Sequence, residues 1–223
     1  MKKDYTSIVL LLDRSGSMQT IRNDVIGGVN SFVEKQAHLP GTADLTLIQF
    51  DDKYEVNFIN KPLKNVLKLN EDAFVPRGMT ALLDAIGRGI NDLGHKLAKQ
   101  PENKRPERVI FVIFSDGQEN TSFEFTYEKI SEMIKHQRDK YNWQFIYLGA
   151  NLDAVKEASR FGILKNNAMT YSASTIGTQS AYSAVSDLVG SMRCSSVSSM
   201  NSVSFSEEDK KEQEKLINNN KQQ

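Results

Sequence analysis

The sequence predicts a doubly wound α/β domain of the Rossmann-like kind. We expect a mostly parallel sheet of about six strands, with one antiparallel edge strand and helices on both faces. Short apolar runs alternate along the chain with longer stretches in which apolar residues recur every three or four positions, and this pattern indicates alternating strands and helices. Residues 8–12 and 109–114 are apolar at every position, which is typical of strands buried on both faces of a parallel sheet.

The first half of the chain begins with the strand at residues 8–12. Apolar residues at three- and four-residue steps then predict an amphipathic helix over residues 19–37, which ends before Pro40. Residues 43–50 and 54–59 follow as two strands joined by a tight turn. We expect the second of these to be antiparallel and to lie at the edge of the sheet.

The second half continues the alternation. A helix is expected over residues 80–97, with Thr80 as its N-cap. A short helix ending at Arg160 is expected to be capped by residues 151–153. The other predicted elements are strands over residues 108–114, 144–148 and 168–171 and helices over residues 125–140 and 177–192.

The last 31 residues differ in composition from the rest. Serine and asparagine dominate at first, and the run from Glu207 to Lys211 is charged at every position. Such a segment buries too little apolar surface to offset the entropy lost on ordering. We therefore expect one domain over residues 1–192 and a disordered polar tail over residues 193–223.

Composition narrows the class of protein. Lys plus Arg and Asp plus Glu number 28 each, so no net charge favours nucleic acid or an acidic membrane as a partner. The longest apolar runs have five or six residues, far below the ~20 that span a bilayer, and no signal peptide is recognisable. The single Cys194 suits a reducing compartment. These features predict a cytoplasmic protein.

Oxygen-bearing side chains follow the ends of predicted elements. Asp13, Ser15 and Ser17 come directly after the first strand, and Asp116 follows the strand that ends near Phe114. Thr80 opens a helix. Because ligands of open α/β sheets bind beyond the carboxyl ends of the strands, we expect these groups to lie together. A set of carboxylates and hydroxyls without His or Cys suits Mg²⁺ or Mn²⁺.

With these five residues in this order, the chain resembles a von Willebrand factor type A domain with a complete metal-ion-dependent adhesion site. The phrases Leu-Leu-Asp-Arg-Ser-Gly-Ser-Met, Gly-Met-Thr-Ala-Leu-Leu-Asp and Ser-Asp-Gly-Gln-Glu-Asn carry the resemblance. They are closest to the small free-standing cytoplasmic proteins of this family from bacteria and phages. The resemblance implies that Asp13 and Asp116 act largely through water or through the serines.

The resemblance also implies a function. It predicts a non-enzymatic protein-binding module whose Mg²⁺ or Mn²⁺ ion binds a Glu or Asp carboxylate of a partner protein. The alternative is a metal-dependent hydrolase or phosphatase-like enzyme that uses the same strand-end acidic site. Each residue taken alone can also have a purely structural role, because Ser and Thr cap helices and Asp116-Gly117 is a common turn pair.

Further polar residues near these segments are weaker candidates for a role in the site. Arg14 is interpreted either as a rim residue that selects an acidic partner or as a solvated side chain. Asp84 is expected to interact with the N-terminal dipole of its helix. The three histidines are expected at surface or interface positions. The remaining second-rank candidates are Asp51, Asp52, Glu119 and Asn120.

Overall fold

A computed structural model describes residues 1–117, 119–150 and 153–220 of the chain. Six strands form one sheet in the order β3-β2-β1-β4-β5-β6. All neighbouring pairs are parallel except β2 and β3, which are antiparallel. This confirms the predicted sheet and its antiparallel edge strand. The strands are β1 (Lys2–Asp13), β2 (Thr42–Phe50), β3 (Tyr54–Pro62), β4 (Pro106–Ser115), β5 (Gln144–Ala150) and β6 (Ala168–Tyr171).

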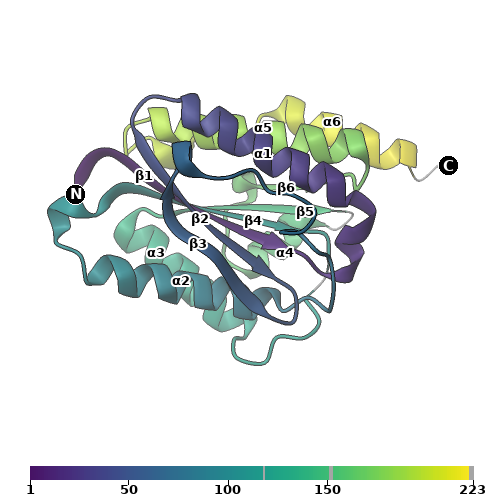
Figure 1. The fold of residues 1–223 in the computed structure, drawn as a ribbon, viewed down its shortest axis with the longest axis horizontal. Coiled ribbons are helices and arrows are strands. Elements are labelled where there is room, and N and C mark those ends of the chain that lie inside the picture. Colours follow the sequence, from purple (N-terminus) through teal and green to yellow (C-terminus); the bar gives the residue numbers. More distant parts are fainter. Residues whose placement is uncertain (118, 151–152, 221–223) are drawn as a thin grey trace.

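Helices cover both faces of the sheet (Figure 1). On one face lie α1 (Arg22–His38), α5 (Thr175–Cys194) and α6 (Glu207–Asn220), and on the other lie α2 (Leu82–Ala98), α3 (Tyr127–Tyr141) and α4 (Ala154–Arg160). Successive side chains of β1 pack alternately against the helices on the two faces of the sheet. Leu10 packs with the α1 and α5 side chains, and Leu11 packs with those of α2 and α3, because side chains alternate across a strand.

The first predicted helix begins differently from the expectation. A 3-10 helix over Gly16–Ile21 precedes α1, which starts at Arg22 rather than near residue 19. The 3-10 turn follows directly from the loop at the end of β1. Its buried side chains Met18 and Ile21 belong to the core on the α1 face, so this loop is fixed to the interior.

The prediction of a disordered tail over residues 193–223 is wrong for the part that the structure describes. α5 runs through the boundary at residue 192 to Cys194, and α6 packs against α5 and β6. Phe205 is 2% exposed in the core on the α1 face. Residues 221–223 of the predicted tail lie outside the described residues.

One amide side chain completes the attachment of α6. The Gln213 Oε1 accepts from the Ser172 N–H at 3.0 Å, and its Nε2 donates to the Gly177 carbonyl at 2.9 Å. The average polarity of this segment does not reveal that it is ordered. A few of its side chains anchor it to a surface that the rest of the domain already provides.

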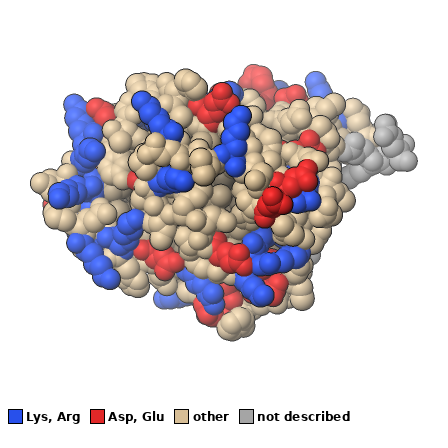
Figure 2. Space-filling view, viewed as in Figure 1, with Lys and Arg blue, Asp and Glu red and all other residues tan. Residues whose placement is uncertain are grey.

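Charged side chains are unevenly placed on the face shown in Figure 2. Basic side chains gather toward the end of the molecule that carries the N-terminus, and both signs mix over the rest of this face. Among the described helices, none is both long enough and apolar enough to cross a membrane.

Candidate metal centre

The candidate centre lies where β1 and β4 end at the same edge of the sheet. These strands pair in register, with Leu12 opposite Phe114, so the next residues, Asp13 and Ser115, also come together. The Ser115 hydroxyl donates to Asp13 Oδ2 at 2.6 Å, and the Ser15 N–H donates to Asp13 Oδ1 at 2.7 Å. Asp13 and Ser115 are fully buried, so the Asp13 carboxylate is held in one orientation.

Two serine hydroxyls connect Asp13's loop with Asp116. Ser15 Oγ lies 3.1 Å from Ser17 Oγ, and Ser17 Oγ donates to Asp116 Oδ1 at 2.7 Å. The 3-10 turn at Gly16–Ile21 folds the chain back after β1, so both hydroxyls reach toward the strand-end loop of β4. Four of the five predicted residues therefore form one continuous group of oxygen atoms.

Thr80 reaches the same place from the other side. A methyl group added to Gly117 would lie 2.8 Å from Thr80 Oγ1 and 3.7 Å from Ser15 Oγ. The two hydroxyls thus border a small space that exists because residue 117 has no side chain. The structure therefore links Asp13, Ser15, Ser17 and Asp116 by hydrogen bonds and places the Thr80 hydroxyl beside Ser15 at Gly117.

The carboxylates of this group are energetically costly in their ionised form. Burial raises the pKa of Asp13 to about 6, against a smaller opposing effect of its hydrogen bonds from Ser115 and Ser15. Burial also raises the pKa of Asp116. Neither carboxylate forms an ion pair with a Lys, Arg or His among the described residues. A fully buried acid and a partly buried one without a paired cation form a place where a bound cation would be favoured.

The donor set fits a hard divalent cation. Every candidate ligand atom is an oxygen, and the three hydroxyls carry no charge. Within the described ranges, no group of three or more His, Cys, Asp or Glu side chains is placed to hold a metal ion, so a site rich in imidazole, thiolate or carboxylate is not present there. The hydroxyl-rich group at Gly117 matches the oxygen preference of Mg²⁺ and Mn²⁺.

Thr80 is not the N-cap of α2, contrary to the prediction. The helix begins at Leu82, with Ala81 in the cap position and no side-chain cap. The Leu83 N–H instead donates to Glu119 Oε2 at 2.9 Å. Asn120 holds the Thr80 backbone through both its side-chain oxygen and its N–H, at 3.0 and 3.2 Å. The Thr80 hydroxyl is thereby left available to the centre.

Arg14 is buried, so neither of the two interpretations made from the sequence is right. It is 5% exposed, and its Nε donates to Asp51 Oδ2 at 3.0 Å. Arg77 Nε donates to the same oxygen at 2.9 Å, and hydrogen bonds from Arg14 above all hold the pKa of Glu55 down at about 2. The Asp51 carbonyl accepts from the Ala81 N–H at 2.9 Å. Asp51 thus ties the Ser15 loop to the Thr80 loop.

Asp84 organises the loop that follows Asp116. Its carboxylate accepts the N–H groups of Phe123, Glu124 and Phe125 at 2.9–3.1 Å. Asp84 also lies in the first turn of α2, the position that the predicted interaction with the helix dipole requires. Its bonding to the loop is an additional role, which is readable only once the loop is known to lie beside α2. Asp52 is exposed on the neighbouring turn, against Gly78.

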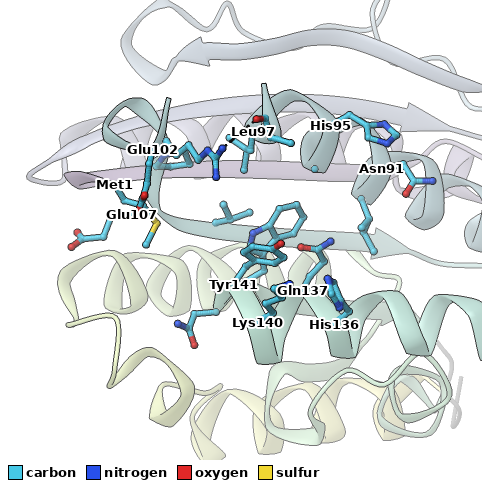
Figure 3. Close-up of a pocket in the computed structure, with 18 residues that line it drawn as sticks. Met1, Asn91, His95, Leu97, Glu102, Glu107, His136, Gln137, Lys140 and Tyr141 are labelled. Carbon is cyan, nitrogen blue, oxygen red and sulfur yellow. Dashed lines mark hydrogen bonds between the residues drawn. The ribbon is translucent and has the colours of Figure 1, made fainter. Parts of the chain in front are cut away.

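The histidines take no part in the centre. His95 and His136 line a cavity of about 420 Å³ between α2 and α3, together with Lys140 and Tyr141 (Figure 3). Pro106 and Trp143 also line it, at the beginnings of β4 and β5. The cavity therefore lies at the edge of the sheet opposite the candidate centre.

The von Willebrand factor type A domain family matches residues 7–219 of the chain. A search of curated proteins finds no match.

Solved structures share the fold. Proximal thread matrix protein 1 from the mussel byssus, solved with a zinc-occupied MIDAS motif, is 18% identical over 83% of this chain, with a TM-score of 0.59. The pilus adhesin SpaC from Lactobacillus rhamnosus GG is 15% identical over 85% of this chain, with a TM-score of 0.63. This chain spans 48% and 30% of those two proteins. The vWF domain of the pilus tip protein Mfa5 from Porphyromonas gingivalis is 10% identical, with a TM-score of 0.59 and coverage of 82% of this chain and 94% of that one.

Proposed function

Because this chain belongs to the von Willebrand factor type A family, we propose that it is a non-enzymatic protein-binding module that depends on a divalent metal ion. A partner protein supplies the carboxylate of a Glu or Asp residue to the metal. Domains of this family are in general interaction modules, and one structural relative is a pilus adhesin. This supports binding as the class of function.

In this proposal Mg²⁺ or Mn²⁺ is held by Asp13, Ser15, Ser17, Thr80 and Asp116. The bound ion supplies a positive centre at the surface for an external carboxylate. The hydroxyls contribute ligands without neutralising the ion, and Asp13 is fixed by Ser115 and the Ser15 N–H. Ser17 is exposed, so a partner side chain can approach from solvent.

One observation carries the proposal. The fully buried Asp13 and the partly buried Asp116, neither with a paired cation, stand in a hydrogen-bonded group with two serine hydroxyls, and the group borders a space that a methyl group on Gly117 would fill. A role in folding alone would not require a fully buried acid of raised pKa such as Asp13, because uncompensated burial of a charge is destabilising.

The hydrolase or phosphatase-like alternative has less support. Phosphatases with an aspartate nucleophile at the end of the first strand place a second acid two residues later, and this chain has Ser15 there. In this proposal both carboxylates of the group hold the metal ion, and no further residue of the group stands out as a general base. We retain the cytoplasmic location as a prediction from the composition alone.

The proposal is tested by titrating the purified protein with Mn²⁺, Mg²⁺ and Zn²⁺ in a calorimeter. We expect the wild type to bind at one site and Asp116→Ala to lose that site while its circular dichroism is unchanged. Asp187→Ala removes a carboxylate whose interactions are with solvent-exposed Lys35 on α1, and it serves as the matched control. Equal Mn²⁺ affinity in Asp116→Ala and the control would show that the proposal is wrong.

A further inference from the structure

Two large apolar side chains are exposed on the loops that carry the candidate centre. Met79 is 51% exposed and directly precedes Thr80. Phe123 is 82% exposed, and its loop is joined to Thr80 by the paired hydrogen bonds of Asn120. We refer to Met79 and Phe123 as the apolar rim.

The apolar rim continues into a shallow hollow beside the centre. Phe123 borders this hollow together with Phe50, Ala81 and Ala85. Its other lining residues are polar or charged: Asp52, Lys53, Tyr54, Asp84 and Arg88. Ala81 follows Thr80, so the hollow begins one residue from a candidate metal ligand. The exposed Met79 and Phe123 and the apolar part of this hollow therefore adjoin the place where a partner carboxylate would bind.

Phe123 is held outward by a well-bonded loop. Its N–H and those of the next two residues donate to Asp84, and the Glu119 carboxylate accepts from the N–H groups of Thr121 and Ser122 at 2.9 and 2.7 Å. Phe125 returns to the protein and contacts Gly87 on α2. A partner would lose little free energy in ordering this loop, because its backbone is already fixed.

We propose that the partner presents its acidic residue next to large apolar side chains, which bury Met79 and Phe123 while the carboxylate binds the metal. This rests on the proposed function and defines its partner class as a protein segment with an apolar-acidic-apolar pattern. Exposed aromatic side chains on rigid loops are the usual anchors of protein interfaces. Charges of both signs line the neighbouring hollow, at Asp52, Lys53, Asp84 and Arg88, so net charge on this side does not select the partner and the two exposed apolar side chains can.

The test uses immobilised synthetic peptides of three kinds at equal density. One has a central Glu flanked by Leu, the second has a central Glu flanked by Ser, and the third has a central Gln flanked by Leu. We expect the first to retain the protein about tenfold more tightly than the second in Mg²⁺, the scale of burying one large apolar side chain. The first peptide should lose binding in EDTA.

Substitutions of Met79 and Phe123 test whether these side chains contact the peptide. Phe123→Ser and Met79→Ser should remove most of the preference for Leu over Ser while Mn²⁺ affinity stays that of the wild type. Leu67→Ser is the matched control, because Leu67 is 79% exposed and its neighbour Leu69 is bonded to Asn30 in the middle of α1. That variant should keep the preference.

The outcomes separate the two proposals. Equal binding of the Leu- and Ser-flanked Glu peptides, or an unchanged preference in Phe123→Ser, overturns the apolar rim and leaves the carboxylate proposal standing. Equal binding of the Glu and Gln peptides, or no peptide binding by a protein that binds Mn²⁺, overturns both.

Discussion

Replacing Asp13 by Asn should stabilise the metal-free protein near neutral pH. The wild-type carboxylate is fully buried, and burial raises its pKa from the ordinary 3.8 to about 6. That difference corresponds to about 3 kcal/mol of unfavourable free energy when the group is ionised, at about 1.4 kcal/mol for each tenfold change in proton affinity. Asn carries no charge, and its side-chain oxygen and NH₂ group can serve the Ser15 N–H and the Ser115 hydroxyl.

The pH dependence gives the sign of the effect. Because the folded protein holds the Asp13 proton more tightly than the unfolded chain, the stability of the metal-free wild type falls as pH rises from about 4 to about 6 and is then level. We expect Asp13→Asn to be more stable than the wild type by about 1–3 kcal/mol near neutral pH. The difference should shrink as pH falls and vanish below about pH 3, where wild-type Asp13 is mostly protonated in both states because its ordinary pKa is 3.8.

The assay is urea unfolding in EDTA, monitored by the fluorescence of Trp143, the single tryptophan, which is 4% exposed. Repeating the unfolding in saturating Mn²⁺ should raise the stability of the wild type and leave Asp13→Asn unchanged, because only a folded protein with an intact site gains from the ion. The reasoning would be refuted by an Asp13→Asn protein that is less stable than the wild type in EDTA near neutral pH, or by a difference that does not change with pH.

Two further changes test the surroundings of the centre. Gly117→Ala should lower Mn²⁺ affinity by about tenfold or more, the scale of disturbing a metal ligand, because the new methyl group would lie 2.8 Å from Thr80 Oγ1 and displace it; calorimetry checks this, and unchanged affinity would contradict it. Gln213→Ala should lower the free energy of unfolding by about 1–3 kcal/mol, because it removes both hydrogen bonds from α6 to Ser172 and Gly177. Urea unfolding in EDTA beside the exposed-site control Glu214→Ala measures that loss, and equal stability of the two variants would speak against the role of Gln213.

The fold and the members of the candidate centre were readable from local patterns. The apolar runs of β1 and β4 identify buried parallel strands, and polar residues after such strands must gather at one edge of the sheet. Asp13, Ser15, Ser17 and Asp116 could therefore be grouped without coordinates. Their binding of a metal ion stays a prediction.

The parts that could not be read depend on pairings between distant residues. Ser115 meets Asp13 only because of the register between β1 and β4. Arg14 is buried because Asp51, at the end of β2, accepts its hydrogen bond, and nothing local in the sequence distinguishes it from an exposed loop arginine. The ordered helix α6 could not be predicted, because its attachment depends on a few side chains such as Gln213 within a polar segment.

In the first turn of α2, the N–H groups of Leu83 and Asp84 donate hydrogen bonds to the side chains of Glu119 and Ser122, which follow them in the chain by 36 and 38 positions. During synthesis, the start of this helix therefore emerges well before the groups that fix it. We expect the start of α2 to fray until β4 has joined the sheet and delivered that loop. Thr80, just ahead of the helix, then reaches its place only late in folding, so a newly made chain would gain its metal affinity after the sheet has formed.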